Sequence, residues 1–271
     1  MKTINGKKIA SNLNEELKDR LKSFRIKENT IPTLVVILVG NNPASNIYVK
    51  NKKIKADEVG INSILKKLDS RVTEKKLLEI IYGYNKDNEV DGILVQLPLP
   101  SHINTNKIID AISYEKDVDG FNSKNIGLLA QGRPYVVPCT PLGCLKLLKT
   151  EIDLAGTSAI VIGRSNIVGR PMSYLLTNQN ATVTLAHSKT QNLKKLCKEN
   201  DIIIAATGIP KMIKKDWVKE QATIIDVGIN QIQDEDNKKA LVGDVDYSDV
   251  LSKVKAITPV PGGVGPMTIH C

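Results

Sequence analysis

The second half of the chain repeats one pattern, in which a short apolar run is followed by a stretch with helical spacing. The four runs are residues 159–163, 182–186, 202–206 and 223–228. Regular alternation of short apolar strands with helices is typical of a parallel sheet that helices cover on both faces. The pattern therefore predicts an α/β fold for this part of the chain.

Two further apolar runs, at residues 33–40 and 92–96, alternate with predicted helices in the first part of the chain. In residues 97–138 the periodic pattern ends, and proline and glycine indicate loops. We place a domain boundary at the end of this stretch. The chain is thus predicted to have two domains. Residues 1–138 form an α/β domain, and residues 139–271 form a Rossmann-like domain with a parallel sheet.

Local signals predict where several elements begin and end. Helices are expected over residues 45–58, closed by Gly60, and over residues 73–84. A helix start is also expected near Asn12, and another at Thr140, whose side chain would cap a helix that opens with a proline. The polar stretch 231–239 is expected to be an exposed loop.

Composition narrows the possible partners and the location. The chain has 271 residues and a formal net charge of +9, but its lysines are dispersed and aromatic residues make up only 4%. This favours small polyanionic ligands over nucleic acid. No apolar run is long enough to cross a membrane or to form a signal peptide, so we expect a cytoplasmic protein with no membrane partner. The cysteines and histidines show no metal-ligand spacing, and no metal site is expected.

A glycine-bearing turn follows the strand at residues 159–163. Gly163 ends the strand and Gly169 lies six residues on, while Ser165 holds the place of the middle glycine in the dinucleotide-binding pattern. A tight turn with no ligand would look similar. The position of the turn at the head of a βαβ series favours a phosphate-binding turn with altered spacing.

The end of the next strand indicates which nucleotide is bound. An NAD enzyme usually places an acidic residue there to accept hydrogen bonds from the ribose 2′-hydroxyl. No acid occurs at residues 186–190, whereas Ser188, Lys189 and Arg164 offer donors and positive charge for a 2′-phosphate. NADP is therefore favoured over NAD, although the same residues could simply be solvated.

In the first domain, Tyr48 and Lys52 are four residues apart on a predicted helix and so share a face. An aromatic ring and an amine could thus project toward one ligand. Because Lys50, Lys53 and Lys55 surround Lys52, a solvated lysine-rich face is the alternative.

Nine motifs, in order along nearly the whole chain, resemble the bifunctional methylenetetrahydrofolate dehydrogenase/methenyltetrahydrofolate cyclohydrolase family. Two of them are long and unusual, DGILVQLPLP and TPVPGGVGPMTI. The others are SNIYVKNK, EKDVDGFN, PCTPLG, VIGRSNIVGRPM, HSKT, IIDVGIN and GDVDY.

The resemblance implies two linked reactions in one-carbon metabolism. The first is NADP-dependent oxidation of 5,10-methylenetetrahydrofolate to the 5,10-methenyl cation, and the second is hydrolysis of that cation to 10-formyltetrahydrofolate. The partners implied are tetrahydrofolate derivatives and a second copy of the chain in a homodimer.

The resemblance also implies roles for individual residues. Lys52 would be the general acid/base of the hydrolysis, Tyr48 would stack on the folate, Gln96 would hydrogen-bond Lys52, and Asp119 would hold the polar edge of the pterin. Further folate-binding residues would be Leu97, Pro261, Gly262 and Gly263. NADP would be held by Gly163, Arg164, Ser165, Ser188 and the backbone at Ile229.

Two features depart from the family pattern. Ile54 stands where a second lysine is usual, and the sequence stops at MTIHC, where relatives continue into a final helix. Lacking that helix, the chain is expected to be less stable or to assemble differently. Two alternative functions remain open: a catalytically silent NADP-binding protein, and another two-domain NADP-dependent dehydrogenase.

Overall fold

The computed structural model describes residues 1–233 and 239–271, which form two compact units. One unit is residues 12–137, and the other combines residues 1–11 with residues 138–271. The first residues join the second unit because β1 (Lys2–Thr3) pairs in parallel with β11 (Ala256–Ile257). No sequence pattern indicated this long-range pairing.

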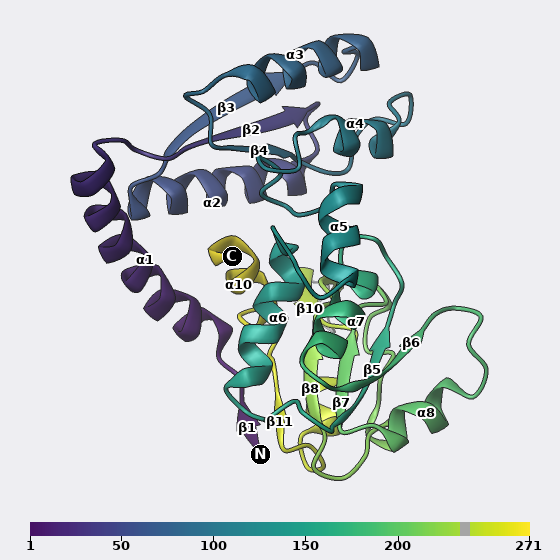
Figure 1. The fold of residues 1–271 in the computed structure, drawn as a ribbon. Helices are drawn as coiled ribbons and strands as arrows, with labels where there is room; N and C mark the ends of the chain where they lie inside the picture. The colour runs from purple at the N-terminus through teal and green to yellow at the C-terminus, as the bar shows by residue number, and fades with distance from the viewer. Residues whose placement is uncertain (234–238) are drawn as a thin grey trace. The chain divides into compact units, whose positions relative to one another are not determined.

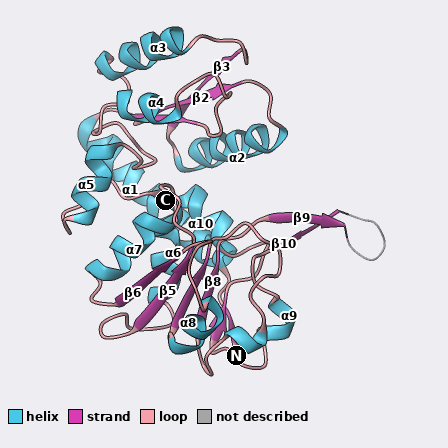
Figure 2. Ribbon diagram, turned by 90° about the vertical axis from the view of Figure 1, so that its right-hand side faces the viewer, coloured by secondary structure: helices cyan, strands magenta, loops and turns pink. Residues whose placement is uncertain are grey.

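The larger sheet belongs to the second unit and is parallel throughout, with the strand order β1-β11-β8-β7-β5-β6. The four predicted apolar runs all form strands in it, which confirms the α/β prediction. Figure 2 shows these strands side by side, with β6 at one edge. Their bounds are β5 (Ser158–Ile162), β6 (Thr182–Ala186), β7 (Ile202–Ala205) and β8 (Thr223–Asp226).

Helices bury both faces of this sheet, which explains why its central strands are apolar without interruption. Ile160, Ile203 and Ile224 pack against α8 (Leu193–Glu199) and the segments near it, and all three are fully buried. The alternate residues are buried on the other face, where α6 (Cys139–Lys149) and α7 (Gly169–Asn178) pack. Each strand therefore contributes side chains to two cores.

The remaining elements of this unit lie mostly after β8, and two local predictions about the unit were wrong. Residues 231–239 are not simply a loop, because β9 (Asn230–Gln233) pairs with β10 (Lys239–Val242); residues 234–238 lie outside the described residues. Thr140 does not cap α6 but lies inside it, where its hydroxyl hydrogen-bonds that of Thr268 at 3.0 Å. The other elements are η1 (Lys215–Trp217), α9 (Tyr247–Val250) and α10 (Val264–His270).

The unit of residues 12–137 is built on a smaller parallel sheet in the order β3-β2-β4. Helices lie on both sides of β2 (Figure 1), and the side chains of β2 point alternately to each. Val36 and Leu38 pack with Val49 of α2, whereas Val35 and Ile37 pack with α3 and α4. The elements are β2 (Thr33–Val39), α2 (Pro43–Val59), β3 (Asn62–Leu68), α3 (Glu74–Lys86), β4 (Gly92–Val95), α4 (Thr105–Ala111) and α5 (Ser123–Ala130).

Capping interactions set the ends of the helices near the site. The Asn42 side chain accepts a hydrogen bond from the Ser45 N–H at the start of α2. At its end, Gly60 adopts the left-handed conformation with φ 93°, as expected for a glycine cap. The predicted helix over residues 45–58 is thus confirmed, with two more residues at its start and one more at its end.

The first helix begins earlier than its sequence signal indicated. The helix α1 (Gly6–Glu28) starts six residues before Asn12, because the Asn5 side chain accepts from the Lys8 N–H. Asn12 therefore lies inside the helix. No helix among the described residues is long and apolar enough to span a bilayer.

We predict that the Asp201 carboxylate stabilises the amino edge of the larger sheet in a pH-dependent way. It accepts hydrogen bonds from the Ser158 N–H, the Ser158 hydroxyl and the Lys219 ammonium, and these hold its pKa at about 2, below the ordinary 3.8. Because the folded-state pKa is lowered, the stabilisation is present above pH 3.8 and is lost as the pH falls through about 2. Replacing Asp201 by Asn should cost about 1 kcal/mol at pH 7, a value discounted for partial exposure of the side chain.

Thermal melts of the wild type and the Asp201→Asn variant between pH 7 and pH 2 test this. The Tm difference should be about 2–4 °C at neutral pH and should shrink as the pH falls below 4. A difference that does not depend on pH would contradict the assignment.

Candidate active site

The helix α2 places Tyr48 and Lys52 one turn apart on the same face. The side chain of Lys52 is only 17% exposed, whereas those of Lys53 and Lys55 are 47% and 45% exposed. Lys53 and Lys55 form ion pairs with acidic residues of the same helix, Asp57 and Glu58. A solvated lysine-rich face therefore describes Lys53 and Lys55 but not Lys52.

The partner of Lys52 is Asp119, whose carboxylate oxygen lies 3.9 Å from the Lys52 ammonium. Burial raises the pKa of Asp119, and the nearby charge of Lys52 acts in the opposite direction. The structure thus brings together two residues that are far apart in the sequence. The family resemblance implied both as site residues, but it implied Gln96 rather than Asp119 as the partner of Lys52. Tyr48 is half-buried, and burial raises the pKa of its hydroxyl, so the ring presents a neutral phenol at pH 7.

The loop that carries Asp119 is held by a second aspartate, Asp117, which the sequence analysis did not single out. Asp117 is 2% exposed and accepts hydrogen bonds from the N–H groups of Gly120 and Asn122 and from the side chain of Asn125. Burial raises the pKa of Asp117, and these donors oppose that shift. The only sequence signal was the repeated acid in the motif DVDG.

Gln96 lies directly after β4, beside the central strand of its sheet. Its N–H donates to the carbonyl of Ile37, and its side-chain amide donates to the carbonyl of Leu97 at 2.9 Å. The side-chain oxygen is buried and accepts no hydrogen bond within the described part of the chain. Since buried polar atoms are normally satisfied, this oxygen is free to accept from a donor such as an ammonium group. No hydrogen bond between the described atoms joins Gln96 to Lys52.

In the second unit, Gly163 and Gly169 form a turn that only glycine fits. Gly163 has φ 124°, and a Cβ there would overlap the carbonyl oxygen of Ala206 after β7. A Cβ on Gly169, at the start of α7, would overlap the carbonyl oxygen of Gly163. Ser165 closes the turn, because its hydroxyl accepts from the N–H groups of Val168 and Gly169.

This turn lies at the point where the strand order reverses, since β5 has β6 on one side and β7 on the other. In open α/β sheets such a point, at the carboxyl ends of the strands, is where nucleotides bind. Gly163 and Gly169 keep side chains away from the backbone at both ends of this turn, which leads into the start of α7, where a pyrophosphate can bind. The residues present therefore suit a dinucleotide.

The neighbouring strand brings the predicted 2′-phosphate donors to the same edge. Ile162 at the end of β5 lies opposite Ala186 at the end of β6. Arg164 and Ser188 therefore follow the two strands at equivalent positions, each two residues beyond this pair. The residues after β6 form a turn in which the His187 N–H donates to the Thr190 hydroxyl. Arg164, Ser188 and Lys189 are all exposed to solvent.

The other predicted ligand-binding residues also follow strands of the larger sheet. Ile229 follows β8 and is 51% exposed. Pro261 is exposed, and Gly262 has φ 103° and accepts a hydrogen bond from the Lys7 N–H. Gly263 packs closely on the carbonyl of Pro259. No cluster of three or more potential metal ligands occurs in residues 1–233 or 239–271.

Two family models match the chain. Residues 4–119 match the catalytic domain of tetrahydrofolate dehydrogenase/cyclohydrolase, and residues 138–271 match its NAD(P)-binding domain. Among curated relatives, the bifunctional protein FolD of Wolbachia pipientis (subspecies Culex pipiens) is 51% identical over 268 residues, which are 98% of this chain and 90% of that protein.

Solved structures of similar proteins share the fold at high identity. The bifunctional FolD methylenetetrahydrofolate dehydrogenase/cyclohydrolase of Campylobacter jejuni is 47% identical with a TM-score of 0.95, and the match covers 100% of this chain and 95% of that one. The Trypanosoma brucei enzyme, complexed with NADP and an inhibitor, is 33% identical with a TM-score of 0.94, covering 99% and 93%.

Proposed function

The chain belongs to the tetrahydrofolate dehydrogenase/cyclohydrolase family, and from that premise we propose how its residues divide the work of two reactions. It is a bifunctional enzyme that oxidises 5,10-methylenetetrahydrofolate to the 5,10-methenyl form with NADP and hydrolyses that product to 10-formyltetrahydrofolate. Neither alternative, a silent NADP-binding protein or a different dehydrogenase, finds support in the comparisons.

The two compact units carry different parts of this activity. We assign folate binding and acid/base chemistry to the first domain, whose Lys52 and Asp119 form an ion pair. NADP binding is assigned to the second domain, whose sheet is completed by the first residues of the chain. The matches to a catalytic and an NAD(P)-binding family model support this division.

In the hydrolysis, Lys52 is the general acid/base. Water adds to the methenyl carbon, and Lys52, once it has given up its ammonium proton and is a neutral amine, takes the proton that the water loses. The bond from that carbon to N5 then breaks as the proton passes from Lys52 to N5. The remaining hydroxyl proton leaves to the solvent, so that the carbon becomes the formyl group on N10. Asp119 at 3.9 Å and the unused side-chain oxygen of Gln96 orient the lysine, while Tyr48 stacks on the folate.

In the oxidation, the protein acts mainly by positioning its ligands. NADP, when bound, accepts the hydride that leaves the methylene carbon. Gly163, Arg164 and Ser165 cradle its phosphates, and Ser188 and the Ile229 backbone complete the contacts. Leu97 is assigned to folate binding in the first domain. Pro261, Gly262 and Gly263 are assigned to folate contacts made by close approach of their backbone, which glycines permit.

We also propose, from the family resemblance, that the enzyme is a cytoplasmic homodimer whose partners are tetrahydrofolate derivatives rather than nucleic acid or membranes. Sedimentation of the purified chain at several concentrations gives its assembly state directly.

Replacing Lys52 by Ala tests the acid/base assignment. Hydrolysis of added methenyltetrahydrofolate should fall by about 10²–10⁴-fold, the usual contribution of a general acid/base group. NADP binding, measured by fluorescence titration, should be unchanged. Lys53→Ala is the matched control, because Lys53 lies on the same helix but is exposed and paired with Asp57. Equal hydrolysis by Lys52→Ala and the wild type would remove Lys52 from the mechanism.

Replacing Arg164 by Ala tests the choice of cofactor. If Arg164 binds the 2′-phosphate, its loss should raise the KM for NADP by about tenfold to a hundredfold and leave the KM for NAD nearly unchanged, since a charge-assisted hydrogen bond is worth about 1.5–3 kcal/mol. Lys195→Ala removes the same charge from an exposed position on α8 and controls for overall electrostatic attraction. An equal rise in KM for both cofactors would place Arg164 elsewhere on the nucleotide.

A further inference from the structure

Two buried aspartates lie against the loop that carries Ile229. Asp226 ends β8 and is 3% exposed, and Asp244 follows β10 and is fully buried. None of the ion pairs among the described residues includes either carboxylate. N–H donors compensate part of their charge, which is an alternative to a salt bridge for a buried carboxylate, and burial still raises the pKa of Asp226 to about 6.

Each aspartate accepts hydrogen bonds from three described donors. Asp226 accepts from the N–H groups of Gly228, Asp244 and Val245, at 3.0, 3.0 and 2.9 Å. Asp244 accepts from the N–H groups of Thr207 and Gly208, at 2.5 and 3.0 Å, and from the side chain of Asn230 at 2.9 Å.

These bonds hold the backbone of Ile229 from both sides. The residue before it, Gly228, donates to Asp226, and the residue after it, Asn230, donates to Asp244. The Ile229 side chain is 51% exposed, so packing of that side chain contributes little to fixing the loop. A Cβ on Gly228 would overlap the Asp244 carboxylate, which shows how closely carboxylate and backbone approach.

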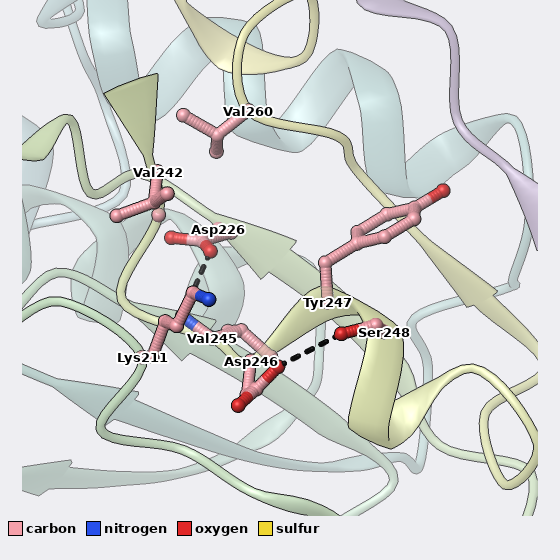
Figure 3. Close-up of a pocket in the computed structure, with 9 residues that line it drawn as sticks. Lys211, Asp226, Val242, Val245, Asp246, Tyr247, Ser248 and Val260 are labelled. Carbon is pink, nitrogen blue, oxygen red and sulfur yellow. Dashed lines mark hydrogen bonds between the residues drawn. The ribbon is translucent and has the colours of Figure 1, made fainter. Parts of the chain in front are cut away.

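The same pair connects other loops at the carboxyl edge of the sheet. Asp244 binds the turn after β7 through Thr207 and Gly208, and the Asp226 N–H donates to the hydroxyl of Thr258 at 2.8 Å. A cavity of about 220 Å³ borders Asp226, and Figure 3 shows Val260 and Tyr247 at other sides of it. Asp226 is nonetheless buried, and a Cβ on Gly243 would overlap its carboxylate, so close packing as well as hydrogen bonds fixes this side chain.

We propose that Asp226 and Asp244 are positioning residues of the oxidation: they fix the Ile229 backbone in the orientation in which it meets NADP, without touching the cofactor. The inference rests on the proposed cofactor contact of Ile229. Displacement of a positioned group by about 1 Å can cost about 10²-fold in rate. Hydrolysis of the methenyl substrate needs no hydride acceptor, so it should not depend on this loop. The two activities of one chain therefore separate a positioning effect from a general loss of structure.

The test uses the full chain with Asp244→Asn and Asn230→Ala. Asp244→Asn replaces one carboxylate oxygen, an acceptor, by an amide NH2 group that faces other donors. Asn230→Ala removes only the hydrogen bond from the Asn230 side chain to Asp244. We expect a rise of tenfold or more in the Kd for NADP and an equal or larger loss of dehydrogenase kcat/KM in Asp244→Asn, with a smaller shift in the same direction in Asn230→Ala. Hydrolysis of methenyltetrahydrofolate should stay within twofold of the wild type.

Asp201→Asn is the matched control, since Asp201 also binds backbone N–H but at the amino edge of the same sheet. It should lower the Tm without changing the ratio of the two activities. If Asp244→Asn and Asn230→Ala keep wild-type NADP affinity, or lose the two activities to the same extent, the proposal is wrong. If Asp244→Asn fails to fold, the Kd for NADP and the two activities of Asn230→Ala test the proposal without it. A wild-type chain that binds no NADP would instead overturn the proposed function.

Discussion

Parallel pairing of β5 with β6 and β7 is the constraint on which the nucleotide site depends. It aligns the carboxyl ends of the strands, so that the glycine turn after β5, the turn after β6 and the loop after β7 meet at one edge. Close packing of Gly163 against Ala206 leaves no room for a side chain at the centre of this edge. Loss of that register would separate Arg164 from Ser188, although each loop could remain intact.

Much of this architecture could be predicted from the sequence, because buried parallel strands leave a continuous apolar signal. The edge strand β3 lacked that signal, since its residues, two lysines among them, are mostly exposed. The helix α5 lay in a stretch whose prolines and glycines favoured loops. Pairing of β1 with β11 joins the two ends of the chain, and no local pattern can indicate such a contact.

The candidate site was predictable in a different way. Helical spacing placed Tyr48 and Lys52 on one face, but the ion pair of Lys52 with Asp119 was not predicted, because the family resemblance implied Gln96 as the partner of Lys52. Asp117, Asp226 and Asp244 were not predicted as site residues, because their partners are mainly backbone N–H groups. Every residue except proline has a backbone N–H, so the amino-acid sequence does not indicate which of these groups bind a carboxylate. The signal that could have indicated them is an aspartate within three residues of a glycine, in the motifs DVDG, IIDVG and GDVD.

The measurement that tests the account most directly is turnover of 5,10-methylenetetrahydrofolate by the purified wild-type chain, with NADP and separately with NAD. Methenyl product is followed after acid quench, and 10-formyl product before it. We expect turnover with a lower KM for NADP than for NAD, and formation of both products by the same chain. Binding of NADP without turnover by either cofactor would contradict it.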